Sequence, residues 1–277
     1  MSSLVVNTNL SAIGAYNNLN ATDNQMSKAI QELSSGLQIQ TAADGPAAYV
    51  QSQALESQAN GYQQAISNAQ DGVSLVQTAS GALNQISSIL QTMDQLAVSS
   101  ANGATNDATS LGANQQEFKN LQASIDQIAS TTSYGTTNLL DGTFSNQTLQ
   151  VGAFDYTSQQ ITLSIGGAST GALGVASGSA SVGTAQAAAS AIALVQAAIA
   201  SVDSIEANVG AIQNQLQAIA ANLTVGQQNL SAANSQLVDV NMAQMMTTFS
   251  TDQILMQTGT AMLSQAQQAP ALVEKLI

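Results

Sequence analysis

The feature that most constrains this chain is an apolar seam along residues 192–237. Its members recur at steps of three and four, so they share one face of an α-helix. They are Ile192, Val195, Ile199, Val202, Ile205, Val209, Ile212, Leu216, Ile219, Leu223, Gly226, Leu230, Ala233 and Leu237. One helix over 184–237 would be about 80 Å long, and a helix with a single apolar stripe is not stable alone in water. The seam therefore predicts a bundle of long helices.

Two other segments offer partners for that seam. The first, 66–97, carries apolar or small residues at helical spacing: Ile66, Ala69, Val73, Val76, Ala79, Leu83, Ile86, Leu90, Met93 and Ala97. The second, near 113–130, repeats the spacing with Asn114, Phe118, Leu121, Ile125 and Ile128. Together the three segments predict a mainly α, elongated coiled-coil or helical-bundle rod.

The two ends of the chain are also helical by pattern. Leu10, Ile13, Leu19, Met26, Ile30, Leu33 and Leu37 line the first, and Met242, Met245, Met246, Phe249, Leu255, Met256, Met262 and Leu263 line the last. Because the order of segments closes on itself like a hairpin, we expect the terminal helices to pair at one end of the rod. A terminal helix of this kind is only marginally stable on its own, so its apolar face predicts packing against other copies of the chain.

The middle of the chain differs from the helical segments. Residues 148–151 and 160–165 alternate with period two, and Asp141-Gly142 is a turn dipeptide, so we expect a small β-hairpin there. The Gly- and Ser-rich stretch at 167–183 predicts a flexible surface loop before the long helix.

Charge is scarce and almost wholly negative. Only 7% of residues are charged, the net charge is −13, and the cations are Lys28, Lys119 and Lys275. A nucleic-acid partner needs clustered cations, and so does an anionic membrane surface, so we expect neither. The N-terminus lacks a signal-peptide pattern, and 185–200 falls short of a spanning helix, which favours a soluble protein.

The chain lacks two of the side-chain types that most often carry out catalysis. Cys and His are both absent, which removes thiolate nucleophiles, imidazole bases and His-ligated metals. Ser27 adjoins Lys28, but neighbouring residues on a helix point in different directions, so a Ser–Lys hydrolase is disfavoured. We therefore expect no catalytic, cofactor or metal site, and no enzyme.

The scarcity of cations also suggests a preference for acid. Near pH ~3 most Asp and Glu side chains are protonated, so a polymer of such chains would carry little net charge. An acidic habitat is the hypothesis that follows.

Several motifs resemble bacterial flagellin. They are SSGLQIQTAADGPAAY, NTNLSAIGAYNNLN, SNAQDGVSLVQTASGALNQISSILQTMDQLAVSSANG and DQILMQTGTAMLSQAQQAP, and they stand in the family's order. The resemblance implies a secreted subunit that self-assembles helically into the extracellular flagellar filament for swimming motility. It also implies a division of the chain: 1–44, N-terminal arm and spoke; 45–137, rod helices; 138–183, β-hairpin and loop; 184–236, long rod helix; 237–277, C-terminal arm.

The resemblance also implies roles for particular residues. Self-assembly would use Leu10, Leu19, Leu33, Leu37, Met242, Met246, Phe249, Leu255 and Leu263. The spoke that links the inner core to the outer rod would be built on Ser34, Ser35, Gly36, Gly45 and Pro46. Expected partners are other flagellin subunits, a secretion chaperone at the C-terminal arm, and hook-associated and cap proteins.

The chain departs from the family at charged positions. Members usually carry Arg where this chain has Glu32, Thr92 and Asp94, and those changes remove ion pairs between subunits. In the family an innate immune receptor of animals reads a surface at which this chain keeps only Leu96 and Glu117. A hook–filament junction protein and a secreted coiled-coil translocator are the alternative functions.

Overall fold

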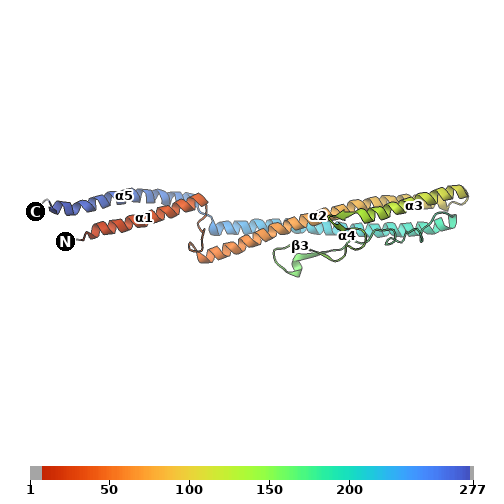
Figure 1. Cartoon of the computed structure of the whole chain (residues 1–277), viewed down its shortest axis with the longest axis horizontal. Helices are drawn as coiled ribbons and strands as arrows, with labels where there is room; N and C mark the ends of the chain where they lie inside the picture. Colours follow the sequence, from red (N-terminus) through yellow and green to blue (C-terminus); the bar gives the residue numbers. More distant parts are fainter. Residues whose placement is uncertain (1–7, 275–277) are drawn as a thin grey trace. The chain divides into compact units, whose positions relative to one another are not determined.

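The computed structural model describes residues 8–274, with side chains described through residue 268. Its helices are α1 (Leu10–Ser35), α2 (Pro46–Ala101), α3 (Ala108–Thr131), α4 (Ala185–Val238) and α5 (Met242–Glu274), as Figure 1 shows. The chain divides into a central unit, 58–229, and a terminal unit made of residues up to 57 and from 230. Helices α2 and α4 each contribute to both units.

The central unit has a continuous apolar core between α2, α3 and α4. All residues of the α2 seam are buried except Val73, which is partly buried. From α3 the core receives Phe118 and Ile125, and from α4 it receives Val195, Val202, Val209 and Leu216. The predicted meeting of the three seams is therefore confirmed. Leu223 is the last buried member of the α4 seam; beyond it Leu230 and Leu237 are partly buried and Ala233 is exposed.

Four short strands form two antiparallel pairs in the same unit. Strand β3 (Gln147–Gln150) pairs with β4 (Gln160–Leu163), confirming the predicted hairpin, and the Thr157–Gln159 3₁₀ turn lies between them. Buried Ile161 and Leu163 attach β4 to the helical core. Strands β1 (Ser133–Tyr134) and β2 (Thr137–Asn138) were not predicted, because a two-residue ladder leaves no periodic signal.

The Gly- and Ser-rich stretch at 167–183 is not the flexible surface loop that its composition predicts. Its apolar side chains Ala168, Val175, Ala180 and Val182 are buried in the core of the central unit. Composition was misleading here because a few apolar residues among many small ones are enough to bury a loop when polar groups are satisfied.

Three polar side chains of α3 satisfy that buried backbone. Gln122 donates from Nε2 to the carbonyl of Val175, at 2.7 Å, and to that of Ala180, at 3.3 Å. Asp126 accepts from the N–H of Thr170 at 2.8 Å. Nearer the N-terminus of α3, the side chain of Gln115 accepts from the N–H of Val182 at 2.6 Å. These bonds hold the loop against the helix.

In the terminal unit, α1 and α5 lie side by side and antiparallel (Figure 1). Asn9 caps α1 by accepting from the N–H of Ala12, and its Nδ2 donates to the carbonyl of Ala266 at 2.7 Å. Two helices alone bury little: Ala29, Glu32 and Asp252 are the buried side chains among the described residues of the pair. The predicted pairing of the terminal helices is confirmed, but without a core of its own.

Helix α4 is more apolar than was expected from the pattern of residues 185–200. It contains an 18-residue window of mean hydropathy 1.6, of which 28% is buried, so by length and composition it could cross a membrane. The expectation that no segment reaches this level is therefore wrong. The same helix supplies the core seam of the central unit, and core helices also pass such a test.

Two glycines of α2 predict opposite responses to alanine. A Cβ at Gly61 would lie 2.6 Å from the Cβ and 3.2 Å from the Cα of Ala153, whereas nothing lies within 4 Å of one at Gly81. We expect Gly81→Ala to raise the free energy of unfolding by up to about 1 kcal/mol. Gly61→Ala should lower it by about 1–3 kcal/mol, because the β3–β4 loop must move away.

Urea denaturation of the two variants, followed by circular dichroism, measures the difference. Equal stabilisation by both alanines would show that Ala153 does not pack on α2 in solution.

Candidate functional site: the terminal arms and their linker

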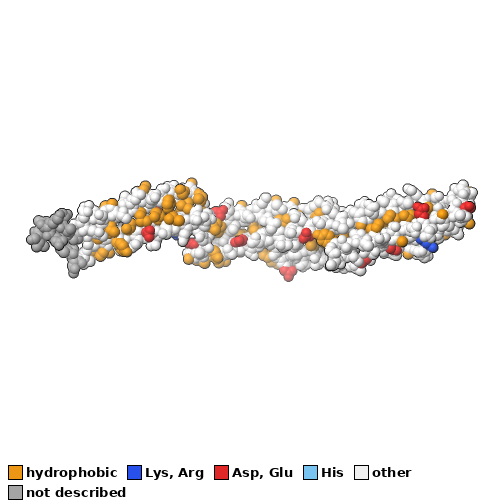
Figure 2. Space-filling view, turned by 45° about the horizontal axis from the view of Figure 1, so that its top comes forward, with side chains coloured by type: hydrophobic (Ala, Val, Ile, Leu, Met, Phe, Trp, Pro, Cys, Tyr) orange, Lys and Arg blue, Asp and Glu red, His pale blue; other side chains and the backbone are white. Residues whose placement is uncertain are grey.

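Large apolar side chains gather on the surface of α1 and α5, the two arms of the chain. Figure 2 shows this surface as the densest apolar region on the face it displays. The exposed members are Leu10, Ile13, Tyr16, Ile30, Met242, Met246, Ile254, Leu255 and Met262. Exposure ranges from 48% for Ile13 and Leu255 to 74% for Leu10. Apolar area of this extent outside a core is typical of a contact surface.

The structure divides the nine predicted self-assembly residues into two groups. Leu10, Met242, Met246 and Leu255 are exposed. Leu19, Leu33, Leu37, Phe249 and Leu263 are half-buried. Five exposed side chains of the arms are not among those nine residues. The arm patterns of the sequence include Ile13, Ile30 and Met262 but omit Tyr16 and Ile254.

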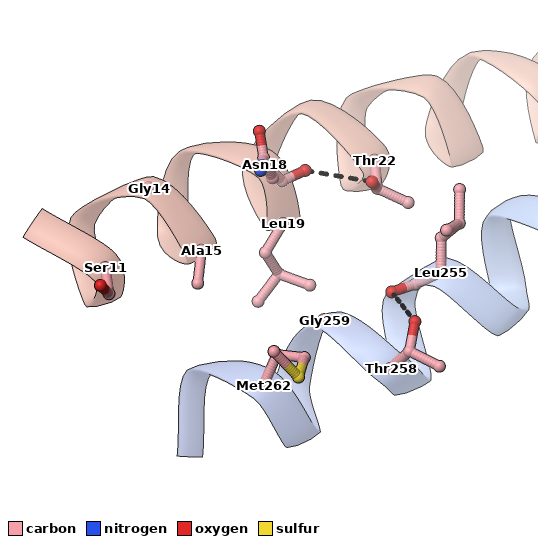
Figure 3. A pocket seen from close by; sticks show the side chains of 10 residues that line it. All are labelled: Ser11, Gly14, Ala15, Asn18, Leu19, Thr22, Leu255, Thr258, Gly259 and Met262. Carbon is pink, nitrogen blue, oxygen red and sulfur yellow. Dashed lines mark hydrogen bonds between the residues drawn. The ribbon is translucent and has the colours of Figure 1, made fainter. Parts of the chain in front are cut away.

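A groove of about 480 Å³ runs between the two arms (Figure 3). Small residues form part of its lining: Gly14 and Ala15 of α1 and Gly259 of α5. Leu19 packs directly on Gly259, since a Cβ there would lie 3.1 Å from the Leu19 Cδ1. Leu255 and Met262 also line the groove. The arms thus approach closely at Gly259 and leave an open apolar depression beside it.

The linker, residues 36–45, begins where α1 ends. Gly36 caps the helix in the left-handed conformation, with φ of 75°, which glycine adopts without strain. Its carbonyl accepts from the N–H of Val240 at 2.9 Å, and the N–H of Gln38 donates to the carbonyl of Val238 at 2.6 Å. Pro46 then opens α2 at its first position, which suits a residue without an N–H. The linker is therefore bonded to the junction between α4 and α5.

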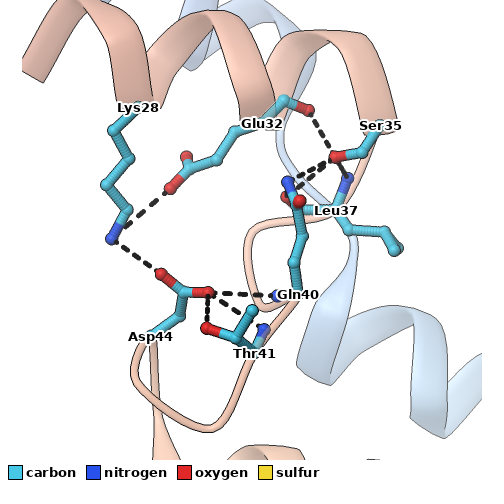
Figure 4. A network of polar contacts seen from close by, with 7 residues as sticks. All are labelled: Lys28, Glu32, Ser35, Leu37, Gln40, Thr41 and Asp44. Carbon is cyan, nitrogen blue, oxygen red and sulfur yellow. Dashed lines mark hydrogen bonds and ion pairs between the residues drawn. The ribbon is translucent and has the colours of Figure 1, made fainter.

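Asp44 organises the inside of the linker (Figure 4). Its Oδ2 accepts from the Thr41 hydroxyl at 2.9 Å, the Thr41 N–H at 3.0 Å and the Gln40 N–H at 3.4 Å. Lys28 of α1 pairs with the other oxygen at 3.3 Å. The Thr41 hydroxyl, then the Thr41 N–H and Lys28, hold the pKa of Asp44 below its usual value.

The serines of the predicted spoke differ in role. Ser35 accepts from the N–H of Leu37 at 3.1 Å and from the side-chain amide of Gln40 at 2.7 Å, so it joins the end of α1 to the linker. Ser34 is exposed and lines a shallow pocket beside Gln40. These contacts give the linker a fixed path.

Lys28 also reaches Glu32, where the resemblance leads one to expect Arg. The two side chains lie 3.7 Å apart, one turn apart on α1, and Glu32 is only 7% exposed. The positive charge thus comes from one turn earlier on the helix. It acts within the chain, holding α1 to the linker through Asp44.

The residues expected at a receptor-binding surface lie in the central unit. Leu96 of α2 is half-buried against the core, and Glu117 of α3 is exposed. Asp94, another departure from the family, has a buried Oδ1 without a hydrogen-bond partner. The receptor surface stays a prediction.

Family models match both ends of the chain. The model for the bacterial flagellin N-terminal helical region matches residues 6–145, and that for the C-terminal helical region matches residues 192–277. A flagellin from Halalkalibacterium halodurans is 38% identical over 274 residues, which cover 99% of this chain and 100% of the relative.

Other relatives are longer. A flagellin from Clostridium tyrobutyricum is 43% identical over 183 residues, which cover 62% of this chain and 47% of the relative, so this chain spans about half of its length. Among solved structures, a flagellar hook-associated protein from Vibrio parahaemolyticus has a TM-score of 0.58 at 13% identity, covering 71% of this chain and 100% of that one. At this identity the likeness shows the fold alone.

The Asp44 contacts predict a pH dependence of the linker. Because its pKa is lowered in the folded chain, the ionised carboxylate stabilises the linker above the unfolded pKa of about 3.9, and that stabilisation is lost as the pH falls through the folded pKa. Thr41→Val removes the main donor and should move the pKa of Asp44 back toward its usual value. NMR titration of the carboxyl carbons measures this shift.

Asp107 is the matched control in the same titration. Its pKa is lowered by Ser110 in the α3 cap, so Thr41→Val should leave it unchanged. An Asp44 titration that ignores the Thr41 substitution would contradict the assignment.

Proposed function

Because this chain belongs to the bacterial flagellin family, whose members are structural subunits of the flagellar filament, we propose that its two arms carry the contacts between subunits. The observation that supports the proposal is the exposed apolar surface of α1 and α5. A surface Leu or Met gains roughly 1.5–3 kcal/mol when fully buried, so several such side chains together favour association strongly. The central unit has no comparable need, since its seams already meet in a core.

The arrangement favours an open polymer. Leu255 and Met262 line the groove between the arms, whereas Leu10, Ile13, Met242 and Met246 are exposed outside its lining, so the arms carry apolar side chains in more than one place. A contact between two different surfaces repeats from copy to copy and does not close on itself unless the rotation happens to form a ring. Helical growth of a filament needs this kind of contact.

The proposed role of the linker is to fix the path of the chain between α1 and α2. The predicted spoke residues Gly36, Gly45 and Pro46 stand at the two helix ends, and the Lys28–Asp44 pair joins α1 to the segment between them. A defined linker lets a load on the arms pass along the chain without unfolding the junction.

Further partners follow from the family. We propose that the chain is exported through the flagellar secretion channel to the cell exterior, with a chaperone covering the C-terminal arm beforehand. The exposed Met242, Met246, Ile254 and Met262 of α5 are apolar enough to require such a cover before assembly. Hook-associated and cap proteins would then meet the same arms at the two ends of the filament.

Substitution of Leu255 tests the assembly surface. Leu255→Gln should raise the subunit concentration needed for seeded filament growth by about tenfold, because the contact loses most of one apolar side chain. Leu255→Met keeps the apolar area and should grow like the unchanged protein. Light scattering and electron microscopy after addition of sheared filament seeds provide the measurement.

Circular dichroism of the monomers checks that both variants keep their helices, since a half-exposed position tolerates substitution. Growth of the Gln variant at the same concentration as the Met variant would place the subunit contacts elsewhere.

A further inference from the structure

Methionine is distributed unevenly between the two units. The arm α5 exposes Met262 at 65%, Met246 at 51% and Met242 at 49%, whereas Met93 in the core of the central unit is fully buried. The three thioethers are part of the exposed apolar surface of the arms. Each is accessible to small oxidants in the unassembled chain.

We propose that Met242, Met246 and Met262 are sites of reversible oxidation that switch off the assembly surface of α5. The proposal rests on the proposed function, because it takes these side chains to be part of the contact between subunits. It adds a chemical class of modifier, a two-electron oxidant such as hydrogen peroxide, and a state of the subunit that cannot join the filament.

The chemistry is balanced and needs no group from the protein beyond the thioether. A sulfur lone pair attacks one oxygen of the peroxide and the O–O bond breaks. The proton on the attacked oxygen passes to the departing hydroxide, directly or through solvent, so the products are a sulfoxide and one water molecule. Sulfur is oxidised by two electrons and the peroxide is reduced by two. Methionine sulfoxide reductases reverse the reaction, one enzyme for each sulfoxide epimer, with a dithiol as the reductant: the oxygen leaves as water and the dithiol becomes a disulfide.

The positions of the three residues connect oxidation to the contact surface. Met242 and Met246 lie one turn apart on the same flank of α5. Met262 lines the groove between the arms, together with Gly14, Ala15 and Leu19 of α1 (Figure 3). A sulfoxide is polar and chiral, so burying it against apolar side chains leaves an unpaired oxygen in the contact. Both regions of the surface are affected.

Exposure predicts an order of reaction along the chain. The three exposed methionines should oxidise first, the half-buried Met245 and Met256 later, and Met93 last. In denaturant all of them should react at similar rates, because burial and not sequence protects Met93. Packing into a filament should protect the exposed three, as should the proposed chaperone before export, so the switch acts on exported subunits that have not yet joined the filament.

The first experiment measures the order of oxidation. Monomers, sheared filaments and denatured chains are treated with hydrogen peroxide, and mass spectrometry of peptides gives the rate at each methionine. We expect Met262, Met246 and Met242 to react at least about tenfold faster than Met93 in the monomer and to slow in the filament. Equal rates for the four methionines in the native monomer, or no slowing in the filament, would overturn the inference.

The second experiment measures the consequence for assembly. Peroxide treatment should raise the concentration of monomer needed for seeded growth by about tenfold or more, and reduction by the two reductases should restore it. The variant that combines Met242→Leu, Met246→Leu and Met262→Leu keeps the apolar surface without thioethers. It should grow equally well before and after peroxide, with Met93 still unoxidised.

The outcomes separate this inference from the proposed function. Oxidised unchanged protein that grows like the untreated protein would overturn the switch and leave the arm contacts standing. A triple Leu variant that loses growth after peroxide would also overturn it, because the damage would lie elsewhere. If exchange of Leu255 for Gln has no effect on growth, the arm contacts themselves fail, whatever peroxide does.

Discussion

The burial of apolar side chains between α2 and α4 is the interaction on which the rest of the structure depends. Helices of 56 and 54 residues have one useful face each, and neither is stable in water until that face is covered. In the central unit α3, the β3–β4 hairpin and the 167–183 segment close the remaining sides, so Leu83, Leu90 and Leu216 are fully buried.

The terminal unit has the same kind of helix but fewer layers. Two paired helices contact each other along one line only, so residues on both flanks of that line stay in solvent. Leu19 packs against Gly259, whereas the side chains of Leu10, Ile254 and Met262 remain largely exposed to solvent within the described part of the chain. The incompleteness of the arms is therefore a consequence of geometry and not of a weak apolar pattern. The proposed contacts between copies would cover these flanks.

The sequence reveals most of this fold because its apolar periodicity is so regular. The spacing of Ala69, Leu83 and Leu90 predicts which residues of α2 are buried, and the matching spacing on α4 predicts its partner. The fate of 167–183 could not be predicted, since Val175 and Ala180 are held by Gln122, which is 53 and 58 residues away. A local pattern carries no record of such a long-range hydrogen bond.

The candidate site shows the same limit. The breaks at Gly36 and Pro46 can be predicted from the sequence, because glycine accepts the left-handed conformation that ends a helix and proline suits the first position of one. That Lys28 reaches Asp44 is not readable, since the two stand on different segments and meet only when the linker turns back. Likewise, the spacing of Met242 and Met246 places them on one face of a helix, but only the pairing of α1 with α5 shows that this face is exposed.

Uncharged polar side chains hold segments of this chain together by hydrogen bonds, a role that ion pairs often have in other proteins. The 3 cations of the chain are all Lys, so bidentate Arg contacts are impossible, and amides and hydroxyls hold the irregular segments instead. Asn9 joins the two arms, Gln115 and Gln122 fasten the 167–183 segment, and Thr41 organises the linker around Asp44.

This choice has a consequence for assembly. Attraction between charges reaches about 8–10 Å at physiological salt and weakens as salt increases, whereas apolar burial and neutral hydrogen bonds act at contact and persist. A surface with a net charge of −13 gives approaching copies only repulsion at long range. In the proposed assembly, recognition between copies would therefore come from the fit of apolar side chains into grooves such as that beside Gly259. An oxygen added to a thioether within such a fit would leave a buried polar atom without a partner.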